Sequence, residues 1–307
     1  MSKKIVVVGS TNVDLIIKSE KLPRPGETVL GGTFYKAAGG KGANQAVAAA
    51  RAGGNVYFIS CVGNEYGDES IEGFRKDGIN VDAVKKDPDV ATGIALILVD
   101  ENGENSISVA SGANLSLTVA DIQKAQHIIE EAGVLLMQLE IPVELVEEAA
   151  KIADAAGVKV ILNPAPAMPL GDELLKYVTI LTPNETETEI LTGMEVKNEN
   201  DAKEAASVIL SKGVEMVIIT LGAKGALLAT KDEINIIGAH KVDAKDTTAA
   251  GDVFNGALAL AIAEKKPIHE AIKFANAAAA VSITRMGAQP SAPEREEIEQ
   301  MIPQSIT

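Results

Sequence analysis

Short continuous runs of apolar residues alternate along the chain with segments whose apolar residues recur at helical spacing. Such runs occupy residues 133–139, 158–162, 177–181 and 214–220, and each ends in polar or glycine-containing sequence. An uninterrupted apolar run is typical of a strand covered on both faces, and the alternation predicts repeated strand–helix–strand units. We therefore expect an α/β fold with an open, mostly parallel sheet and with ligands at the carboxyl ends of its strands.

Polar side chains follow these predicted strands. The apolar run at residues 4–9 is followed by Asn12 and Asp14, which flank Val13 and would point the same way in an extended segment, as ligands of sugar hydroxyl groups must. A turn capped by Asn or Asp is the alternative for this segment. The same edge of the sheet should carry three more polar residues that follow later strands: Glu140, Asn163 and Asn184.

Two extended segments lack a helical period. Residues 15–38 contain Pro and paired Gly residues, which predicts short strands with bends, and residues 92–110 contain the hairpin signal Asn102-Gly103. Ile107 and Val109 alternate with serines, so this ribbon has one apolar face. We expect the segments to form a small separate sheet, whose apolar face needs a cover: a substrate, the main domain or a second copy of the chain.

A glycine-rich stretch, Gly39-Gly40-Lys41-Gly42-Ala43-Asn44-Gln45, opens an alanine-rich helix that we expect to end near Ala52. It is not a Walker loop, because Tyr35 stands where that pattern needs Gly and Gly42 stands where it needs Ser or Thr. A helix start with Lys41 and Asn44 facing a ligand predicts a site for an anion or for hydroxyl groups. Tight helix packing is the alternative explanation for the glycines.

A small polar loop, Asp246-Thr247-Thr248-Ala249-Ala250-Gly251-Asp252, opens into a helix expected over residues 251–265, and a second helix is expected at about 269–284. The first N–H groups of a helix lack partners within it, so such a loop can bind an anion. Asp252, kept ionised by the same dipoles, would lie beside that anion as a base, which suggests phosphoryl transfer. Alternatively, Asp246 is only an N-cap and Asp252 only an acid that suits the helix dipole.

Two further stretches carry a possible ligand role and a plain structural one. Asn184 and Glu187 are three residues apart at the start of a predicted helix, within reach of one hydrated cation or paired in a capping box. Residues 220–227 predict a strand, a Gly turn and a second strand. That segment suits backbone contact with a nucleotide, and a plain hairpin is the alternative.

Composition and charge narrow the classes of function. The chain has 307 residues, of which 46% are apolar, and a net charge of −15, which opposes binding to nucleic acid or to anionic membranes. The single cysteine, Cys61, fits a reducing compartment, and three dispersed histidines make a zinc site or a histidine-based triad improbable. No apolar run is long enough to span a bilayer, and Met1–Lys4 lead directly into a strand, so we expect a cytoplasmic location.

Three motifs, in their order and spacing, resemble the carbohydrate kinase family named for phosphofructokinase B, and most of all its ribokinase-like members. They are Gly39-Gly40-Lys41-Gly42-Ala43-Asn44-Gln45-Ala46, Asn184-x-x-Glu187 and Asp246-Thr247-x-x-Ala250-Gly251-Asp252, within a match from Gly9 to about Pro293. The resemblance implies a single domain over 1–307 with three α-β-α layers. A small β-sheet lid, from about 13–38 and 90–111, would cover the sugar and pair with a second lid in a homodimer.

The resemblance also implies an activity, the ATP-dependent phosphorylation of D-ribose at its primary 5-hydroxyl, and a role for each matching residue. Asp252 would take the proton of that hydroxyl, and the N–H groups of Ala249, Ala250 and Gly251 would hold the transferring γ-phosphoryl group. The sugar ligands would be Asn12, Asp14, Gly40, Lys41, Asn44 and Glu140. The nucleotide would contact Asn184, Thr220, Gly222, Gly225, Gly251 and Asn276. Glu187 would organise hydrated Mg²⁺. A monovalent cation, usually K⁺, would be held by Asp246, Thr248, Ser282, Arg285, Gly287 and Ser291.

Two positions depart from the family pattern. Ala249 stands where many members have Gly, which removes easy access to a positive φ angle, and Asn276 stands where some relatives place His near the adenine. Other kinases of this fold, for deoxyribose, fructose or nucleosides, and a catalytically silent sugar sensor are the alternative functions. A nicotinamide dehydrogenase is disfavoured, because no Gly-x-Gly-x-x-Gly follows the first strand.

Overall fold

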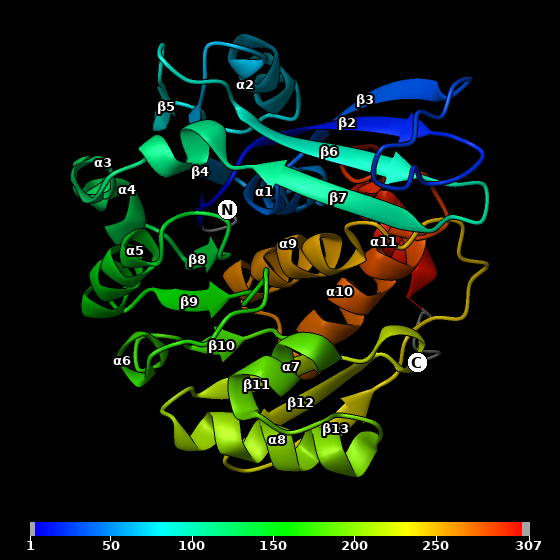
Figure 1. The fold of residues 1–307 in the computed structure, drawn as a ribbon. Coiled ribbons are helices and arrows are strands. Elements are labelled where there is room, and N and C mark those ends of the chain that lie inside the picture. Colours follow the sequence, from blue (N-terminus) through cyan, green and yellow to red (C-terminus); the bar gives the residue numbers. More distant parts are fainter. Residues whose placement is uncertain (1–3, 303–307) are drawn as a thin grey trace.

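A nine-stranded sheet forms the centre of the molecule (Figure 1). The computed structural model describes residues 4–302, so the expectation for Met1–Lys3 falls outside the described residues. The strand order is β13-β12-β11-β10-β9-β8-β1-β4-β5. The strands are β1 (Ile5–Val8), β4 (Val56–Val62), β5 (Val84–Lys86), β8 (Val134–Met137), β9 (Lys159–Leu162), β10 (Ile180–Leu181), β11 (Met216–Thr220), β12 (Ala226–Thr230) and β13 (Ile234–Ile237).

The sheet is mostly parallel, as the strand–helix alternation predicted. All pairs from β5 to β11 are parallel, and only β12 and β13 run antiparallel to their neighbours. The carboxyl ends of β1, β8, β9, β10 and β11 therefore share one edge. The strand predicted at 177–181 is shorter in the structure, because Tyr177 still belongs to the preceding turn, where its N–H donates to the Leu174 carbonyl at 3.1 Å.

Helices cover both faces of this sheet and create two separate apolar cores. On β1, Val6 and Val8 pack into one core, while Ile5 and Val7 pack into the other, as alternation along a strand requires. The first core contains α3 (Val119–Lys124), α4 (Gln126–Glu130), α5 (Val143–Ala155), α6 (Asp172–Leu175), α7 (Glu185–Thr192) and α8 (Glu199–Ser211). The second contains α1 (Lys41–Arg51), α2 (Gly67–Lys76), α9 (Ala250–Ala263), α10 (Ile268–Ser282) and α11 (Arg295–Met301). The α-β-α layering is as predicted.

A four-stranded sheet with the order β3-β2-β6-β7 lies outside these layers (Figure 1). Its strands are β2 (Asn12–Lys18), β3 (Thr33–Gly39), β6 (Gly93–Val99) and β7 (Asn105–Ala110). The expectation of short, bent strands between residues 15 and 38 was wrong, since β2 and β3 pair over seven residues each and the Pro and Gly residues lie in their connection. Ile107 and Val109 are 56% and 54% exposed, so the apolar face predicted for this ribbon is uncovered in the single chain.

Short 3₁₀ helices complete the description: η1 (Gly112–Ser116), η2 (Gly222–Lys224) and η3 (Gln289–Ser291). In the described part of the chain, no helix combines the length and apolar character that crossing a bilayer requires.

Candidate functional site

The predicted chemistry gathers at the carboxyl edge of the large sheet. A cavity of about 180 Å³ lies there, between the ends of β9, β10 and β11 and the first turns of α1, α7 and α9. It is lined by Lys41, Asn163, Ala165, Thr182, Asn184, Glu187, Thr220, Thr247, Ala249, Ala250, Gly251, Asp252 and Asn255. Residues from all three motifs thus meet in one small polar space, although the chain separates them by up to about two hundred positions.

The loop before α9 has the geometry of an anion site. Ala249 precedes α9 with a φ angle of 59°, a left-handed conformation that is costly for any residue with a Cβ atom. The N–H groups of Ala249 and Gly251 have no partner among the described residues, whereas the N–H of Ala250 donates to the Thr247 carbonyl at 3.2 Å. The departure at Ala249 therefore does not prevent the positive φ angle, and two of the three predicted amides are free to bind an anion.

Asp252 is buried in the first turn of α9 and held at both oxygens. Its Oδ2 accepts from Asn44 Nδ2 at 3.0 Å, and its Oδ1 accepts from Gln45 Nε2 at 2.9 Å. Burial raises the pKa of Asp252, which the charge of Lys41 and the two amide donors oppose. Helix dipoles alone were predicted to keep this carboxyl ionised. In the structure Asp252 is buried, which disfavours its charge, and the two side-chain amides compensate for part of that effect.

Asp14 and Lys41 both lie close enough to Glu140 and Asp252 to interact with their charges. Burial, together with the nearby charges of Glu140 and Asp252, raises the pKa of Asp14 to about 6. Burial disfavours the charge of Lys41, but Asp252, Glu140 and Glu187 outweigh that effect and raise its pKa. Among the described residues, the ammonium group of Lys41 is therefore the single positive charge beside several carboxylates, whose oxygens could accept hydrogen bonds from hydroxyl groups.

Asn12 is positioned by a residue that the sequence reasoning did not assign. Asn114, in η1, donates from Nδ2 to Asn12 Oδ1 at 2.8 Å and accepts from the Thr11 N–H at 2.8 Å. A Cβ atom on Gly93 would lie 2.0 Å from Asn12 Oδ1, and one on Gly40, whose φ angle is 90°, would lie 2.7 Å from the Asn12 nitrogen. The start of the small sheet is thus closely packed where Asn12 enters the site.

Glu140 joins two of the predicted segments. Its Oε2 accepts from Ser10 Oγ at 2.6 Å and from the Lys41 N–H at 2.9 Å, at the start of α1. Beside Glu140 and Asn12 lies a second cavity of about 460 Å³, whose other walls include Leu139, Ile141 and the exposed strand β7. Ser10 was not among the predicted residues, because a lone serine after a strand carries no signal of its own.

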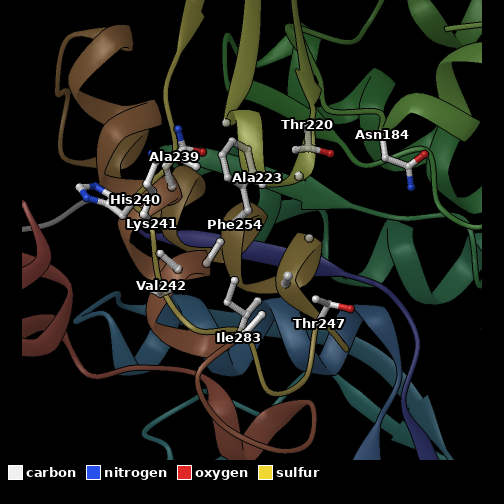
Figure 2. A pocket seen from close by; sticks show the side chains of 18 of the residues that line it. Asn184, Thr220, Ala223, Ala239, His240, Lys241, Val242, Thr247, Phe254 and Ile283 are labelled. Carbon is white, nitrogen blue, oxygen red and sulfur yellow. The ribbon is translucent and has the colours of Figure 1, made fainter. Parts of the chain in front are cut away.

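A larger cavity, of about 780 Å³, is lined in part by Ala250 and Gly251 of the anion loop (Figure 2). Figure 2 shows Asn184, Thr220 and Thr247 toward one side of this cavity and the run from Ala239 to Val242 toward the other. The cavity is lined by all six residues predicted to contact the nucleotide, Asn184, Thr220, Gly222, Gly225, Gly251 and Asn276, and also by Ala250. His240 and Lys241 also line it and were not predicted, since nothing in their local sequence distinguishes them from an ordinary loop.

Two of these lining residues, Gly225 and Asn276, also stabilise the local fold. A Cβ atom on Gly225, whose φ angle is 102°, would lie 2.1 Å from the Ile237 carbonyl oxygen, so β12 and β13 can close only over a glycine. Asn276 Nδ2 donates to the carbonyls of Ile237 and Gly238 at 3.1 and 3.2 Å. Asn276 therefore holds the loop after β13 that borders the cavity.

Asn184 and Glu187 form the capping box at the start of α7. Glu187 Oε2 accepts from the Asn184 N–H at 2.8 Å, and Asn184 Oδ1 accepts from the Glu187 N–H at 2.8 Å. Burial raises the pKa of Glu187, which also lines the small polar cavity. No three His, Cys, Asp or Glu side chains within residues 4–302 gather closely enough to hold a metal ion by themselves.

The residues predicted to hold a monovalent cation lie around one junction. Asp246 Oδ1 accepts from the Thr248 N–H at 2.8 Å, and its Oδ2 accepts from the Gly287 N–H at 2.8 Å. These bonds outweigh burial and lower the pKa of Asp246. The Arg285 guanidinium pairs with Glu297, and the hydroxyls of Ser282 and Ser291 donate to the carbonyls of Ala279 and Ala288.

Comparison with known proteins agrees with this geometry. The pfkB family of carbohydrate kinases matches residues 2–295. The chain is 50% identical over 298 residues to the ribokinase of Haemophilus influenzae, covering 97% of each chain, and 38% identical over 302 residues to the deoxyribokinase of Salmonella typhi, covering 97% and 98%. The structure of Arabidopsis thaliana ribokinase in complex with ribose and ATP superposes with a TM-score of 0.91 at 34% identity, covering 98% and 99%.

The match to the family covers almost the whole chain and includes every motif that meets at the sheet edge. Fold, motif order and the position of Asp252 beside the anion loop agree with one another. The chain belongs to the pfkB family of carbohydrate kinases and is a sugar kinase.

Proposed function

We propose that the protein transfers the γ-phosphoryl group of ATP to the primary 5-hydroxyl of D-ribose, giving ribose 5-phosphate and ADP. The observation that carries this proposal is the placement of Asp252 in the cavity that joins the Asp14 and Lys41 region to the anion loop. The ribokinase names of the relatives support ribose as the sugar.

The reaction needs positioning and charge compensation more than covalent catalysis. The sugar would bind to Asn12, Asp14, Gly40, Lys41, Asn44 and Glu140. Asp252 takes the proton of the 5-hydroxyl as that oxygen bonds to the γ-phosphorus and the bond to the bridging oxygen of ADP breaks. The N–H groups of Ala249 and Gly251, which have no partner among the described residues, would stabilise the charge that develops on the transferring group.

The nucleotide would occupy the 780 Å³ cavity, with Asn184, Thr220, Gly222, Gly225 and Asn276 along its walls. Mg²⁺, when bound, neutralises charge on the phosphates. Glu187 fits a hydrated Mg²⁺, because its carboxylate lines the polar cavity beside the anion loop and no cage of protein ligands is required there. Both readings of Asn184 and Glu187 are then compatible, since the capping box holds the carboxylate in place.

K⁺ is proposed to bind at the junction of Asp246 with the turn that contains Gly287. An ionised Asp246 and the oxygen atoms of Thr248, Ser282, Arg285, Gly287 and Ser291 form a donor set of the kind that a hard cation prefers. A cation there would stiffen the connection between this turn and the residues that lead into the anion loop.

The small sheet of β2, β3, β6 and β7 is proposed as a lid, from about 13–38 and 90–111, over the sugar. Its exposed apolar residues, among them Ile107 and Val109, support burial against a second lid in a homodimer. We keep the proposal of a cytoplasmic protein with no nucleic-acid or membrane partner, on the grounds of the free, buried Cys61 and the net charge of −15.

A substrate panel tests the function. ADP release is measured with D-ribose, deoxyribose, fructose and a nucleoside at equal concentrations, with and without ATP. The proposal expects the highest kcat/KM for D-ribose and phosphate on its 5-oxygen, as read by ³¹P and ¹³C NMR. A higher value for another sugar would reassign the substrate, and sugar binding without any ADP release would favour the sugar sensor.

A further inference from the structure

A chain of buried amide side chains stands behind Asp252. Gln138, directly after β8, donates from Nε2 to Gln45 Oε1 at 2.6 Å. Gln45, in α1, donates from its own Nε2 to Asp252 Oδ1 at 2.9 Å and to Asn163 Oδ1 at 3.0 Å. Gln45 and Gln138 are both fully buried. None of the roles proposed above includes these two glutamines.

The hydrogen bonds leave Gln45 one orientation. Its Oε1 must face the donor on Gln138, so both hydrogens of its Nε2 face acceptors. Asn163 is itself oriented, because its Nδ2 donates to the Thr182 carbonyl at 3.1 Å. A rotated Gln45 amide would aim an oxygen at the Asp252 carboxylate and at Asn163 Oδ1, which removes two bonds and adds repulsion.

This row of hydrogen-bonded amides includes a feature that lowers the stability of the fold. Gln138 Oε1 is buried without any hydrogen-bond partner among the described residues. It lies where a side chain on Gly9 would stand, 2.2 Å from the Cβ position. A buried acceptor without a partner is unfavourable, and an apolar residue at position 138 would avoid it. The presence of Gln138 despite this cost indicates that it has a role in the site as well as in packing.

We propose that Gln45 and Gln138 are positioning residues for the base: Gln138 fixes the amide of Gln45, and Gln45 holds Asp252 ionised and turned toward the sugar hydroxyl. This rests on the proposed role of Asp252. The other charged groups that act on Asp252 are Lys41 on α1 and Glu140 after β8, joined by Asp14 on β2 and Glu187 on α7. Lys41 supplies attraction without direction, whereas the Gln45 bond also fixes the carboxylate plane.

The test is the pH profile of kcat with ribose and ATP in the Gln138→Met and Gln45→Met variants. At similar side-chain volume, Gln45→Met removes a donor to Asp252, whereas Gln138→Met removes the donor that holds the Gln45 amide in place. In both variants Asp252 becomes harder to ionise, so the acid limb moves to higher pH. We expect the loss of kcat at pH 6 to exceed the loss at pH 8 severalfold, with ribose KM little changed. The matched control is Gln123→Met, an exposed glutamine of α3 that pairs with Glu148 far from the site.

The sequence of hydrogen bonds from Gln138 through Gln45 to Asp252 provides a second test. Since Gln138 acts through Gln45, the double variant should have the same acid limb as Gln45→Met alone. A uniform loss of kcat at every pH, or an equal further shift from Gln138→Met in the Gln45→Met background, would overturn the proposal. Gln45→Met carries the test should Gln138→Met not fold. An inactive wild type would instead contradict the proposed function, so the two failures are distinguishable.

Discussion

The side-chain nitrogen of Asn44, in α1, donates a hydrogen bond of 3.0 Å to Oδ2 of Asp252, in α9. These residues are 208 positions apart in the chain. The bond places the carboxylate of one motif against the glycine-rich start of another. Asn44 Oδ1 is buried and has no hydrogen-bond partner among the described residues, an unfavourable arrangement that the proposed contact with a sugar hydroxyl would relieve.

Ribose affinity should depend on the ionisation of Asp14, whose pKa is raised to about 6. A carboxylate accepts from two hydroxyls, while its protonated form loses part of that capacity. We therefore expect the Kd for ribose, measured by calorimetry, to fall about tenfold between pH 5 and pH 7. Asp14→Asn should bind more weakly and show a flat profile, whereas Asp154→Asn, on the exposed side of α5, should keep the wild-type profile. An unchanged pH profile in Asp14→Asn would contradict the assignment.

The same raised pKa has a consequence for stability. Between the ordinary value of 3.8 and about 6, the folded protein binds more protons at Asp14 than the unfolded chain does. The contribution of Asp14 to the free energy of unfolding therefore decreases as the pH rises through this window. Denaturation by urea at pH 4.5 and 6.5 should show that Asp14→Asn gains more stability relative to wild type at pH 6.5 than at pH 4.5.

The left-handed conformation of Ala249 predicts opposite effects of two substitutions. In Ala249→Gly, relief of about 1 kcal/mol of backbone strain is offset by the greater freedom of unfolded Gly, so stability and kcat should change little. Ala249→Val puts a β-branched residue at positive φ and should lower kcat by an order of magnitude or more through misplaced amides. Thermal unfolding and steady-state kinetics check both. A Val variant with wild-type kcat would show that the loop geometry is not needed.

Lid pairing predicts that a charge on the apolar face of β7 makes the protein monomeric. Ile107→Asp places a carboxylate on that face, while Ser108→Asp places one on the opposite face of the same strand. Light scattering should report a dimer for wild type and Ser108→Asp and a monomer for Ile107→Asp. A monomeric wild type would contradict the proposed dimer, and a dimeric Ile107→Asp would move it to another surface.

Activation by K⁺ should depend on Asp246. Replacement of K⁺ by a large organic cation should lower kcat/KM on the order of tenfold, since the anion loop would lose its fixed geometry, and added KCl should restore it. Asp246→Asn should raise the K⁺ concentration needed for half-maximal activity. Equal activity with and without K⁺ would contradict the proposed role of the cation.

Local patterns predicted the α/β layers and the parallel strands because each strand or helix carries its own periodicity. The loop at 246–252 was likewise recognisable, since its small residues and the helix after it are contiguous in sequence. Gln138, Asn114 and His240 were missed because each is a common residue type in an ordinary context. Only the folded topology brings them beside Gln45, Asn12 and the large cavity.

The pKa of Asp252 was also beyond local reasoning. A carboxyl in a first helical turn suggests an exposed acid that favours the helix dipole. In the structure, the closing of α1 over α9 buries it, and burial depends on residues distant in sequence. The motif thus indicates Asp252 as a candidate base, but its electrostatic environment could not be predicted from local sequence.

The turnover number of Asp252→Asn is the most direct test of the proposed role of Asp252 as the base. Ribose binding to this variant, measured by calorimetry, and the effect of Asn255→Asp are measured beside it. Asp252→Asn keeps the shape of the site but removes the base, so kcat should fall about 10²-fold or more while ribose still binds. Asn255→Asp in the Asp252→Asn background, one helical turn further along α9, shows whether a carboxylate elsewhere in this helix can replace Asp252; we expect that it does not restore turnover. Turnover by Asp252→Asn close to that of the wild type would contradict the central claim.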